Sequence, residues 1–282
     1  MSSPHGLGPF RPTNDRAADD RAADDIALDN DPLTRVLGEL AAEPPKGFAA
    51  RVIARYVLTA GPVGEVFVAF TNQGISYVRP ADEVEADADR FAEDFRERFR
   101  RPIERAGRPP AGLVTALETG RARELSFDLR GLSEFEQAVL RKALEIPRGE
   151  TRPYAWVARE IGRPKAVRAT GSALGHNPVP ILIPCHRVVR SDGQIGNYAL
   201  GPAMKHELLG AEEVDLEEAS RLAAAGVHYL ASDTTRVVCY PSCHHARRIT
   251  PPHRVPFGTL ARAVDAGYRP CRDCRPGLAD TA

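Results

Sequence analysis

The chain has 282 residues, enough for two or three domains with hydrophobic cores, and its 38 lysines and arginines balance its 38 aspartates and glutamates. A net charge of zero excludes a protein that is basic throughout, but aspartates gather near the N-terminus and arginines near the C-terminus, so a basic terminal module can still bind nucleic acid. Because the sequence shows neither the apolar core of a signal peptide nor a run long enough to cross a bilayer, we expect a cytoplasmic protein with no membrane contact and with reduced cysteines.

Residues 1–45 are predicted to form a disordered acidic arm. They contain the sequence Arg-Ala-Ala-Asp-Asp twice in tandem, at 16–20 and 21–25. Low hydrophobicity and clustered charge disfavour a packed core there. We assign no function to this arm.

Residues 46–127 are predicted to form a small α/β domain. The apolar patterning indicates three strands and one helix, at 52–58, 65–70, 74–78 and 86–99. Within the helix, Phe91, Phe95 and Phe99 recur every four residues and so share one face. The segment contains no cysteine or histidine, and we interpret it as a scaffold.

The next segment has the pattern of a helical domain. Ser133 and Glu136 form a capping box that predicts the start of a helix. Two short helices are expected at 154–161 and 165–174, and the glycine-containing turn between them gives helix-turn-helix spacing. The second carries mostly small residues and one long side chain, Arg168. Such a smooth face suits either close DNA contact or close helix packing, and both remain open at this stage.

Residues 179–184 are the densest apolar stretch, which we interpret as a short buried strand that delivers Cys185. His186 and Arg187 follow it. Imidazole or cationic neighbours favour the thiolate, which is the reactive form of cysteine. However, successive side chains on a strand point apart, and a lone cysteine on an apolar strand is commonly an inert core residue. Local pattern alone leaves both interpretations open.

Residues 130–213 resemble the catalytic domain of the O6-alkylguanine-DNA alkyltransferases, also called methylated-DNA–protein-cysteine methyltransferases. The most specific signature is Pro-Cys-His-Arg-Val at 184–188, preceded by Asn-Pro-Val-Pro at 177–180. The remaining matches are 146–154, Arg168, 196–198 and 205–212. Residues 51–127 resemble the N-terminal domain of the family more loosely. The resemblance implies an α+β fold with a helical, winged-helix-like alkyltransferase domain at 128–215.

The resemblance also implies a reaction and the residues that perform it. A damaged guanine would be flipped out of double-stranded DNA, and its alkyl group would pass irreversibly to Cys185, once per molecule and without a cofactor. His186 would take the thiol proton through a water molecule, and Glu212 would orient the imidazole. Asn177 would brace the active-site turn, and Tyr154 would donate to the leaving guanine. Because some relatives that only flag lesions lack the cysteine, its presence argues against a non-catalytic lesion-binding protein.

The same resemblance implies the DNA-binding surface and the alkyl pocket. A nucleoid-associated monomer would contact DNA through Tyr154 and the smooth helix. Arg168 would fill the space left by the flipped base, and the small residues Ala169 and Gly171 would lie beside it. The alkyl pocket would be walled by three residues, Pro180, Tyr198 and Leu200. Since several relatives have smaller residues near Leu200, we hypothesise that methyl adducts are preferred over benzyl-type groups.

Residues 225–282 are predicted to form a small zinc domain. Cys239 and Cys243 make one close pair, and Cys271 and Cys274 make another. Two such pairs fit a tetrahedral zinc site that stabilises a small fold, whereas disulfides are disfavoured in a reducing compartment. Because four thiolates complete the shell, the nearby histidines are interpreted as surface residues; these are His244, His245 and His253.

This terminal segment resembles the zinc domain of the Ada adaptive-response protein, at 238–243, 246–248 and 266–276. In that domain the first cysteine also accepts a methyl group from a DNA methylphosphotriester, which implies the same role for Cys239. Residues 236–238 depart from the pattern, and the order of the modules is inverted. A purely structural zinc site and an alkylation sensor that regulates transcription therefore stay open. The interpretation as a transcription regulator is the weaker of the two, because 216–226 is only a short helix-like linker and leaves no room for an AraC-like domain.

Overall fold

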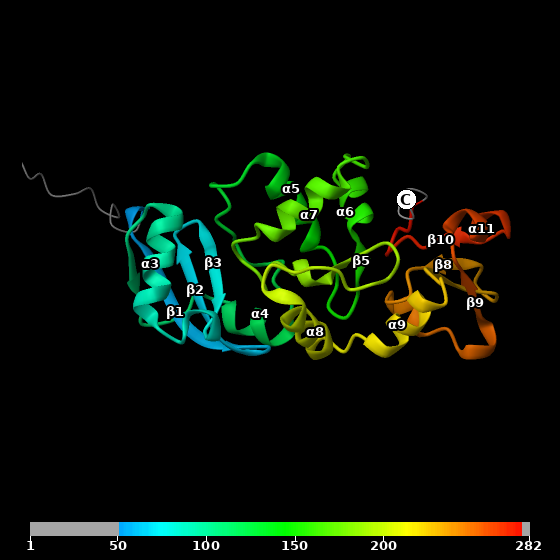
Figure 1. Ribbon diagram of the computed structural model, residues 1–282, viewed down its shortest axis with the longest axis horizontal. Coiled ribbons are helices and arrows are strands. Elements are labelled where there is room, and N and C mark those ends of the chain that lie inside the picture. Colours follow the sequence, from blue (N-terminus) through cyan, green and yellow to red (C-terminus); the bar gives the residue numbers. More distant parts are fainter. Residues whose placement is uncertain (1–50, 278–282) are drawn as a thin grey trace, which may run out of the picture. The chain divides into compact units, whose positions relative to one another are not determined.

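The computed structural model describes residues 51–277 (Figure 1). The acidic arm predicted at 1–45 lies outside the described residues. Within 51–277, none of the helices combines the length and the apolar character that crossing a bilayer requires. The described elements form a mixed α+β protein, as the sequence predicts.

The N-terminal domain is a four-stranded sheet of order β3-β2-β1-β4 that is covered by one main helix. Its elements are β1 (Ala54–Gly61), β2 (Gly64–Thr71), β3 (Gly74–Pro80), η2 (Asp82–Val84), α3 (Ala88–Phe99), β4 (Ile103–Arg105) and α4 (Leu113–Thr119). Phe91 of α3 is buried and stacks on Phe67 of β2, with ring centroids 4.9 Å apart. The three predicted strands and the phenylalanine face of the helix are thus confirmed.

The central domain contains the predicted helices. Its elements are α5 (Glu134–Ala143), β5 (Arg152–Pro153), α6 (Tyr154–Glu160), α7 (Val167–Gly175), η3 (Cys185–Arg187), β6 (Val188–Val189) and α8 (Gly201–Ala211). The capping box of Ser133 and Glu136 is present at the start of α5. Gly162, with a φ of 74°, begins the turn between α6 and α7. The short strands β5 and β6 pair in parallel and so join the approach to α6 to the segment after η3.

The buried strand predicted at 179–184 is wrong, because this segment is a series of tight turns that leads into the 3-10 helix η3. Three prolines, at 178, 180 and 184, remove backbone donors that a strand ladder needs. Local bonds replace the ladder: the Ile183 N–H donates to the Val179 carbonyl, and the Cys185 N–H donates to the Ile183 carbonyl. Ile181 adopts a φ of 72°, which is strained for a β-branched residue.

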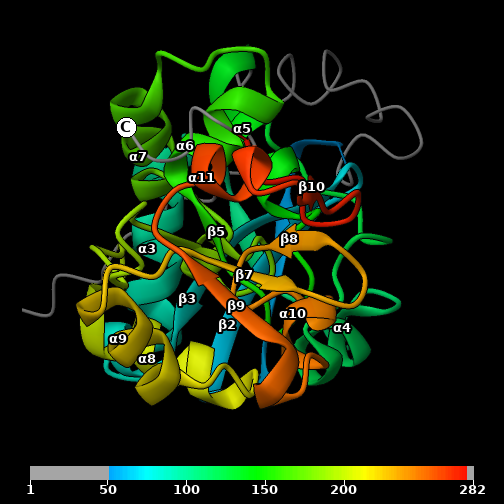
Figure 2. The ribbon, with the colours of Figure 1, turned by 90° about the vertical axis from the view of Figure 1, so that its right-hand side faces the viewer.

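The C-terminal module is a second four-stranded sheet, of order β10-β8-β7-β9, seen toward the viewer in Figure 2. Its elements are α9 (Leu216–Ala224), β7 (Tyr229–Ser232), β8 (Val237–Cys239), α10 (His244–Arg247), η4 (Pro251–His253), β9 (Arg254–Phe257), α11 (Leu260–Asp265) and β10 (Arg269–Pro270). The apolar core of this module is small, and the four cysteines are buried within it.

Candidate active site and metal centre

Cys185 lies at the start of η3 and is only 3% exposed, but its side chain lines a cleft of about 530 Å³. Tyr154 of α6, Arg168 and Gly171 of α7, and Tyr198 line the same cleft. Cys185 is therefore largely shielded by its neighbours and borders the cleft. Five candidate residues that lie far apart in the sequence thus meet at one cavity.

Asn177 holds the turn that presents the sulfur. Its Nδ2 donates to the Ile183 carbonyl at 3.0 Å and to Cys185 Sγ at 3.1 Å, while its Oδ1 accepts the Val179 N–H at 3.0 Å. Burial raises the pKa of the Cys185 thiol, and the hydrogen bond from Asn177 and the charge of Lys205 oppose that rise. The amide thus both braces the backbone and supports negative charge on sulfur.

His186, Glu212 and Arg187 form a buried, hydrogen-bonded group. His186 Nε2 lies 2.9 Å from Glu212 Oε1, and the Arg187 guanidinium contacts both carboxylate oxygens, with Nε 2.9 Å from Oε2 and Nη2 2.6 Å from Oε1. Burial alone would raise the pKa of Glu212, but hydrogen bonds from His186 and Arg187 outweigh it and lower the pKa to about 2. Burial also lowers the pKa of His186, which favours the neutral imidazole. Its Nδ1 is buried without a hydrogen-bond partner among the described residues.

Lys205 is a candidate site residue with no role assigned from the sequence, and Arg187, expected only as a cationic neighbour of the thiol, instead pairs with Glu212. Lys205 has no exposed surface, and its Nζ donates to the Val188 carbonyl at 2.6 Å and to the Asn197 carbonyl at 3.3 Å. Burial lowers its pKa to about 8, although Cys185 opposes the shift. The sequence signal that could have indicated Lys205 is its position in helix α8. It lies on the buried face of that helix, where the other buried residues, Leu208 and Leu209, are apolar.

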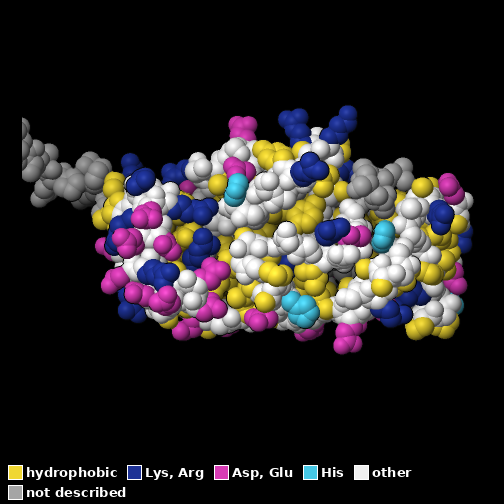
Figure 3. All heavy atoms as spheres, in the orientation of Figure 1, with side chains coloured by type: hydrophobic (Ala, Val, Ile, Leu, Met, Phe, Trp, Pro, Cys, Tyr) yellow, Lys and Arg dark blue, Asp and Glu magenta, His cyan; other side chains and the backbone are white. Residues whose placement is uncertain are grey.

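Small residues lie on both sides of helix α7, since Ala169 is exposed and Ala173 is buried. Arg168 and Ala169 are exposed on α7, whereas a Cβ added to Gly171 would lie 3.8 Å from the Tyr154 ring. Figure 3 shows Lys and Arg side chains that project from the surface near α6 and α7. The exposed basic residues of this region include Arg163 and Lys165.

The cleft does not include every residue expected in the alkyl pocket. Tyr198 lines it, and burial together with the nearby sulfur raises the pKa of its hydroxyl well above the usual value. Pro180 and Leu200 do not line it: Pro180 is buried, and Leu200 precedes the first turn of α8. The lining of this cleft gives no support for a pocket narrowed by Leu200, and the preference for methyl adducts stays a prediction.

The four C-terminal cysteines come together as a candidate metal centre. The Sγ atoms of Cys239, Cys243, Cys271 and Cys274 all lie within 4.8 Å of one another, and all four residues are buried as free thiols. Hydrogen bonds from Cys239 and Cys274 lower the pKa of Cys243 far below its usual range, while the contact with Cys243 raises the pKa of Cys239. Four thiolates without a cation would repel one another, so the donor set fits a tetrahedral ion that binds thiolate.

The surroundings distinguish one cysteine of the first pair from the other. Cys239 and Cys271 line a second cleft of about 510 Å³, together with three arginines, Arg248, Arg269 and Arg272, whereas Cys243 and Cys274 do not line it. The nearby histidines lie at the surface and contact carboxylates: His245 Nε2 lies 2.6 Å from Asp273 Oδ2, and His253 Nδ1 lies 2.9 Å from Asp233 Oδ1.

Comparison with known proteins identifies both sites by family. Residues 134–214 match the family described as 6-O-methylguanine DNA methyltransferase, DNA binding domain, and residues 217–277 match the metal binding domain of Ada. The chain is 35% identical over 169 residues to a methylated-DNA–protein-cysteine methyltransferase of Methanosarcina barkeri, and the alignment covers 57% of this chain and 98% of that relative. It is 36% identical over 180 residues to the regulatory protein Ada of Salmonella typhimurium, covering 63% of this chain and 50% of that relative.

Among solved structures, the chain resembles that of Mycobacterium tuberculosis OGT in complex with DNA. The TM-score is 0.45 at 32% identity, over 56% of this chain and 93% of that one. The two matched families follow one another along the chain: the first contains Cys185, and the second contains the four-cysteine cluster.

Proposed function

The chain belongs to the family of methylated-DNA–protein-cysteine methyltransferases, and on that premise we propose that Cys185 is the acceptor of the alkyl group in a single-turnover DNA repair reaction. The observation that carries this assignment is the position of Cys185. The residue lines a cleft and directly precedes the buried His186, and its sulfur accepts a hydrogen bond from Asn177. The proposed substrate is double-stranded DNA that contains O6-alkylguanine, bound by a monomer in the cytoplasm.

Ionisation of the thiol is proposed to run through His186. The imidazole is neutral because burial lowers its pKa, so its unpartnered Nδ1 can accept the thiol proton through a water molecule. Glu212 holds the opposite nitrogen and favours the imidazolium that forms, while Arg187 keeps the carboxylate ionised. Lys205 and Asn177 stabilise the negative charge that develops on sulfur.

The thiolate then attacks the alkyl carbon. An S–C bond forms as the bond between that carbon and the guanine O6 breaks, and the electron pair of the broken bond stays on the guanine. A proton from Tyr154 neutralises the guanine, Tyr154 regains a proton from solvent, and the imidazolium of His186 returns its proton to solvent. Tyr154 lines the cleft, and its hydroxyl donates to the Asn197 carbonyl at 3.3 Å. To donate to the leaving base, the hydroxyl exchanges this long bond for one to the guanine. The thioether product is stable to water, which is why one molecule repairs one lesion.

DNA binding is proposed to use α6 and α7, which lie beside the cleft. The exposed Arg168 is the one long side chain on a face of small residues, and it lines the cleft that receives the base. A flipped nucleotide leaves a gap in the stack, which a side chain of that length can fill at lower energetic cost than water. Ala169 is exposed on the same helix and allows close approach of the DNA backbone.

The C-terminal module is proposed to hold one zinc ion through its four cysteines. Cys239 is the candidate for a second acceptor, of methyl groups from DNA phosphotriesters, because it borders a cleft that also contains Arg248, Arg269 and Arg272. Arginines attract a phosphate backbone, and methylation of one thiolate would remove a negative charge that repels it. The alternative of a transcription regulator has the likeness to Ada in its favour, but the alignment covers only half of that relative.

Peptide mass spectrometry after incubation with methylated DNA tests the assignment. Methyl on the peptide that contains Cys185, absent in a Cys185→Ser variant, supports guanine repair. Additional methyl on Cys239 supports repair of phosphotriesters, and methyl on Cys185 alone supports a structural metal site. Unmodified wild-type protein after binding to lesion-containing DNA would overturn the assignment of both acceptors.

A further inference from the structure

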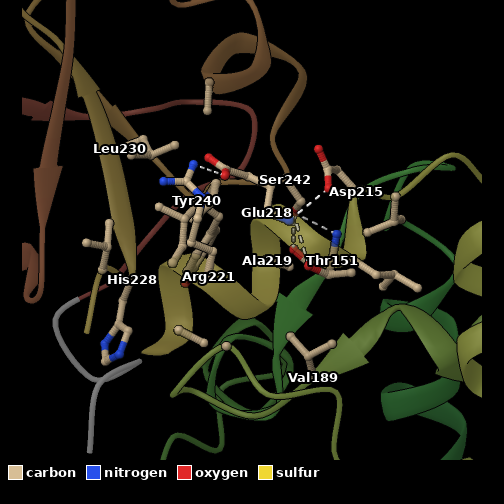
Figure 4. Close-up of a pocket in the computed structure, with 18 of the residues that line it drawn as sticks. Thr151, Val189, Asp215, Glu218, Ala219, Arg221, His228, Leu230, Tyr240 and Ser242 are labelled. Carbon is tan, nitrogen blue, oxygen red and sulfur yellow. Dashed lines mark hydrogen bonds and ion pairs between the residues drawn. The ribbon is translucent and has the colours of Figure 1, made fainter. Parts of the chain in front are cut away.

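The metal module contacts the catalytic domain through the segment that leads into α6. Figure 4 shows the junction, with Thr151 and Ser242 facing each other. The Thr151 N–H donates to Ser242 Oγ at 2.9 Å, and the Ser242 hydroxyl donates to the Thr151 carbonyl at 3.1 Å. Ser242 directly precedes the metal-ligand candidate Cys243, so the conformation of the cysteine loop decides whether these bonds can form.

Glu150, next in the chain to Thr151, makes a second connection. Its carboxylate is buried; Oε1 accepts the His244 backbone N–H at 3.1 Å and lies 2.9 Å from His244 Nδ1. The other oxygen pairs with Arg152 at 2.5 Å, and the Arg152 guanidinium lies over the rings of Trp156 and Tyr240, at 5.8 and 5.5 Å from their centroids. This junction thus combines a buried ion pair with aromatic contacts from both domains.

The C-terminal end of α6 is contacted by Arg275, the residue that follows the second cysteine pair. Arg275 directly follows Cys274, and its guanidinium pairs with Glu160 at 3.0 Å and with Glu145 at 3.3 Å. The same guanidinium lies over the Trp156 ring, 5.5 Å from its centroid. Residues next to Cys243 therefore contact the segment that leads into helix α6, and the residue next to Cys274 contacts the C-terminal end of the helix.

Residues 149–154, which the metal module contacts, also lie against the catalytic groups. Tyr154, the first residue of α6, lines the cleft with Cys185. Gly149 donates its N–H to Glu212 Oε2 at 3.4 Å, and a Cβ added there would lie 2.9 Å from the Glu212 carbonyl oxygen. Residues 149–154 thus lie between the metal module and the groups that position the imidazole and the flipped base.

From this arrangement we propose that the metal-bound module positions α6 and residues 149–152 for alkyl transfer at Cys185, with Ser242 and Arg275 as positioning residues. Metal binding orders the two cysteine loops, since a core this small depends on its ion. When the metal is released, the contacts of Ser242 with the segment before α6 and of Arg275 with the C-terminal end of α6 are lost. Tyr154 can then shift by a fraction of an ångström, which slows the reaction. The proposal rests on the assignment of Cys185 as acceptor.

The kinetic test uses the full-length, metal-loaded protein. We expect the double variant Ser242→Ala/Arg275→Ala to transfer methyl from saturating methylated DNA about tenfold or more slowly than wild type, because misplacement near a reacting centre slows the chemical step rather than binding. The matched control is Ser232→Ala/Arg262→Ala, which changes the same residue types in the same module away from the junction, and it should keep the wild-type rate constant. Equal rate constants in both double variants would overturn the proposal.

A second readout is independent of activity. Trp156 is the single tryptophan of the chain and lies between Arg152 and Arg275, so its fluorescence reports on the junction. We expect removal of the metal by a chelator to shift the emission of wild type and the control, and to leave little further shift in the Ser242→Ala/Arg275→Ala variant. Unchanged wild-type emission on metal removal would exclude the coupling even if Cys185 is methylated normally. Failure of wild type to methylate Cys185, by contrast, would overturn the acceptor assignment itself.

Discussion

Glu212 and Arg187 form a buried ion pair beside the nucleophile, with the guanidinium Nη2 2.6 Å from carboxylate Oε1. The same oxygen lies 2.9 Å from His186 Nε2, so a single carboxylate atom links the cation to the base. The pair explains how an acidic side chain that is nearly inaccessible to solvent stays ionised. It also makes the pH dependence of stability a direct measure of the site.

Glu212 should make folding stability sensitive to acid. Its pKa falls from an ordinary 4.5 to about 2 in the folded protein, so its contribution is present above pH 4.5 and is lost as pH falls toward 2. At about 1.4 kcal/mol per pKa unit, the contribution is about 3 kcal/mol. Urea unfolding between pH 4.5 and pH 2 should show that wild type loses this contribution to the free energy of unfolding and that Glu212→Gln does not. The exposed neighbour Glu213→Gln is the control, and a similar acid slope in all three proteins would contradict the assignment.

Replacement of Asn177 should weaken both the fold and the nucleophile. Asn177→Ala leaves the Val179 N–H and the Ile183 carbonyl without their buried partner, which should lower the free energy of unfolding by about 1–3 kcal/mol. The lost hydrogen bond to sulfur should also raise the pKa of Cys185, seen as slower labelling by a thiol reagent at neutral pH. Asn72→Ala, at an exposed turn position, should change neither quantity. Normal stability of Asn177→Ala would show that the turn does not need the amide.

Removal of the Lys205 charge should move the rate profile toward higher pH. The ammonium group lowers the pKa of Cys185, so Lys205→Met should raise it, and a shift of about one unit would slow reaction at pH 7 by about tenfold. The deficit should shrink at higher pH, because the thiol then ionises without help and because Lys205 itself has a pKa of about 8. The measurement is the rate of alkyl transfer from a free O6-methylguanine base against pH, with Lys142→Met as control. A deficit that stays constant with pH would assign Lys205 a packing role instead.

Arg168 should matter for duplex DNA and not for an isolated base. Arg168→Ala removes the exposed side chain proposed to fill the stack, so transfer from methylated duplex should slow by about tenfold to a hundredfold, as expected when a few kcal/mol of base-flipping energy is no longer offset. Transfer from a free alkylguanine base should be unchanged, since no base must be flipped. Arg163→Ala, in the turn before α7, is the matched control. Equal losses on both substrates would place Arg168 in the chemical step.

Metal content should follow the four cysteines and not the nucleophile. Wild type and Cys185→Ser should each contain about one zinc ion per chain, whereas Cys271→Ser should lose most of it, because a tetrahedral site of this kind needs all four ligands. Elemental analysis of the purified proteins measures the ratio. Full zinc content in Cys271→Ser would show that another group completes the shell, and His244, whose ring nitrogen lies within 4.8 Å of the Cys243 sulfur, would then be the first candidate.

Much of the local structure could be predicted from neighbouring residues alone. The start of α5 follows from Ser133 and Glu136, and the buried face of α3 follows from the spacing of Phe91 and Phe95, because each depends on residues within two helical turns. The cysteine pairs were equally visible, since metal-ligand spacing is a local property of a loop. The local pattern did not indicate the acceptor cysteine. The family signature at 184–188 indicated Cys185, whereas the apolar run at 179–184 wrongly suggested a strand.

Tertiary structure alone decided the parts that depend on partners distant in sequence. Whether Cys185 is reachable depends on α6, α7 and Tyr198 leaving a cleft between them, and no periodicity encodes that space. The ionisation of Glu212 is set by Arg187, 25 residues away, and the junction of Thr151 with Ser242 joins positions 91 residues apart. Sequence determines which side chains can bond, cap or bind metal, but burial and the choice of partner arise only when the packed chain excludes water from around them.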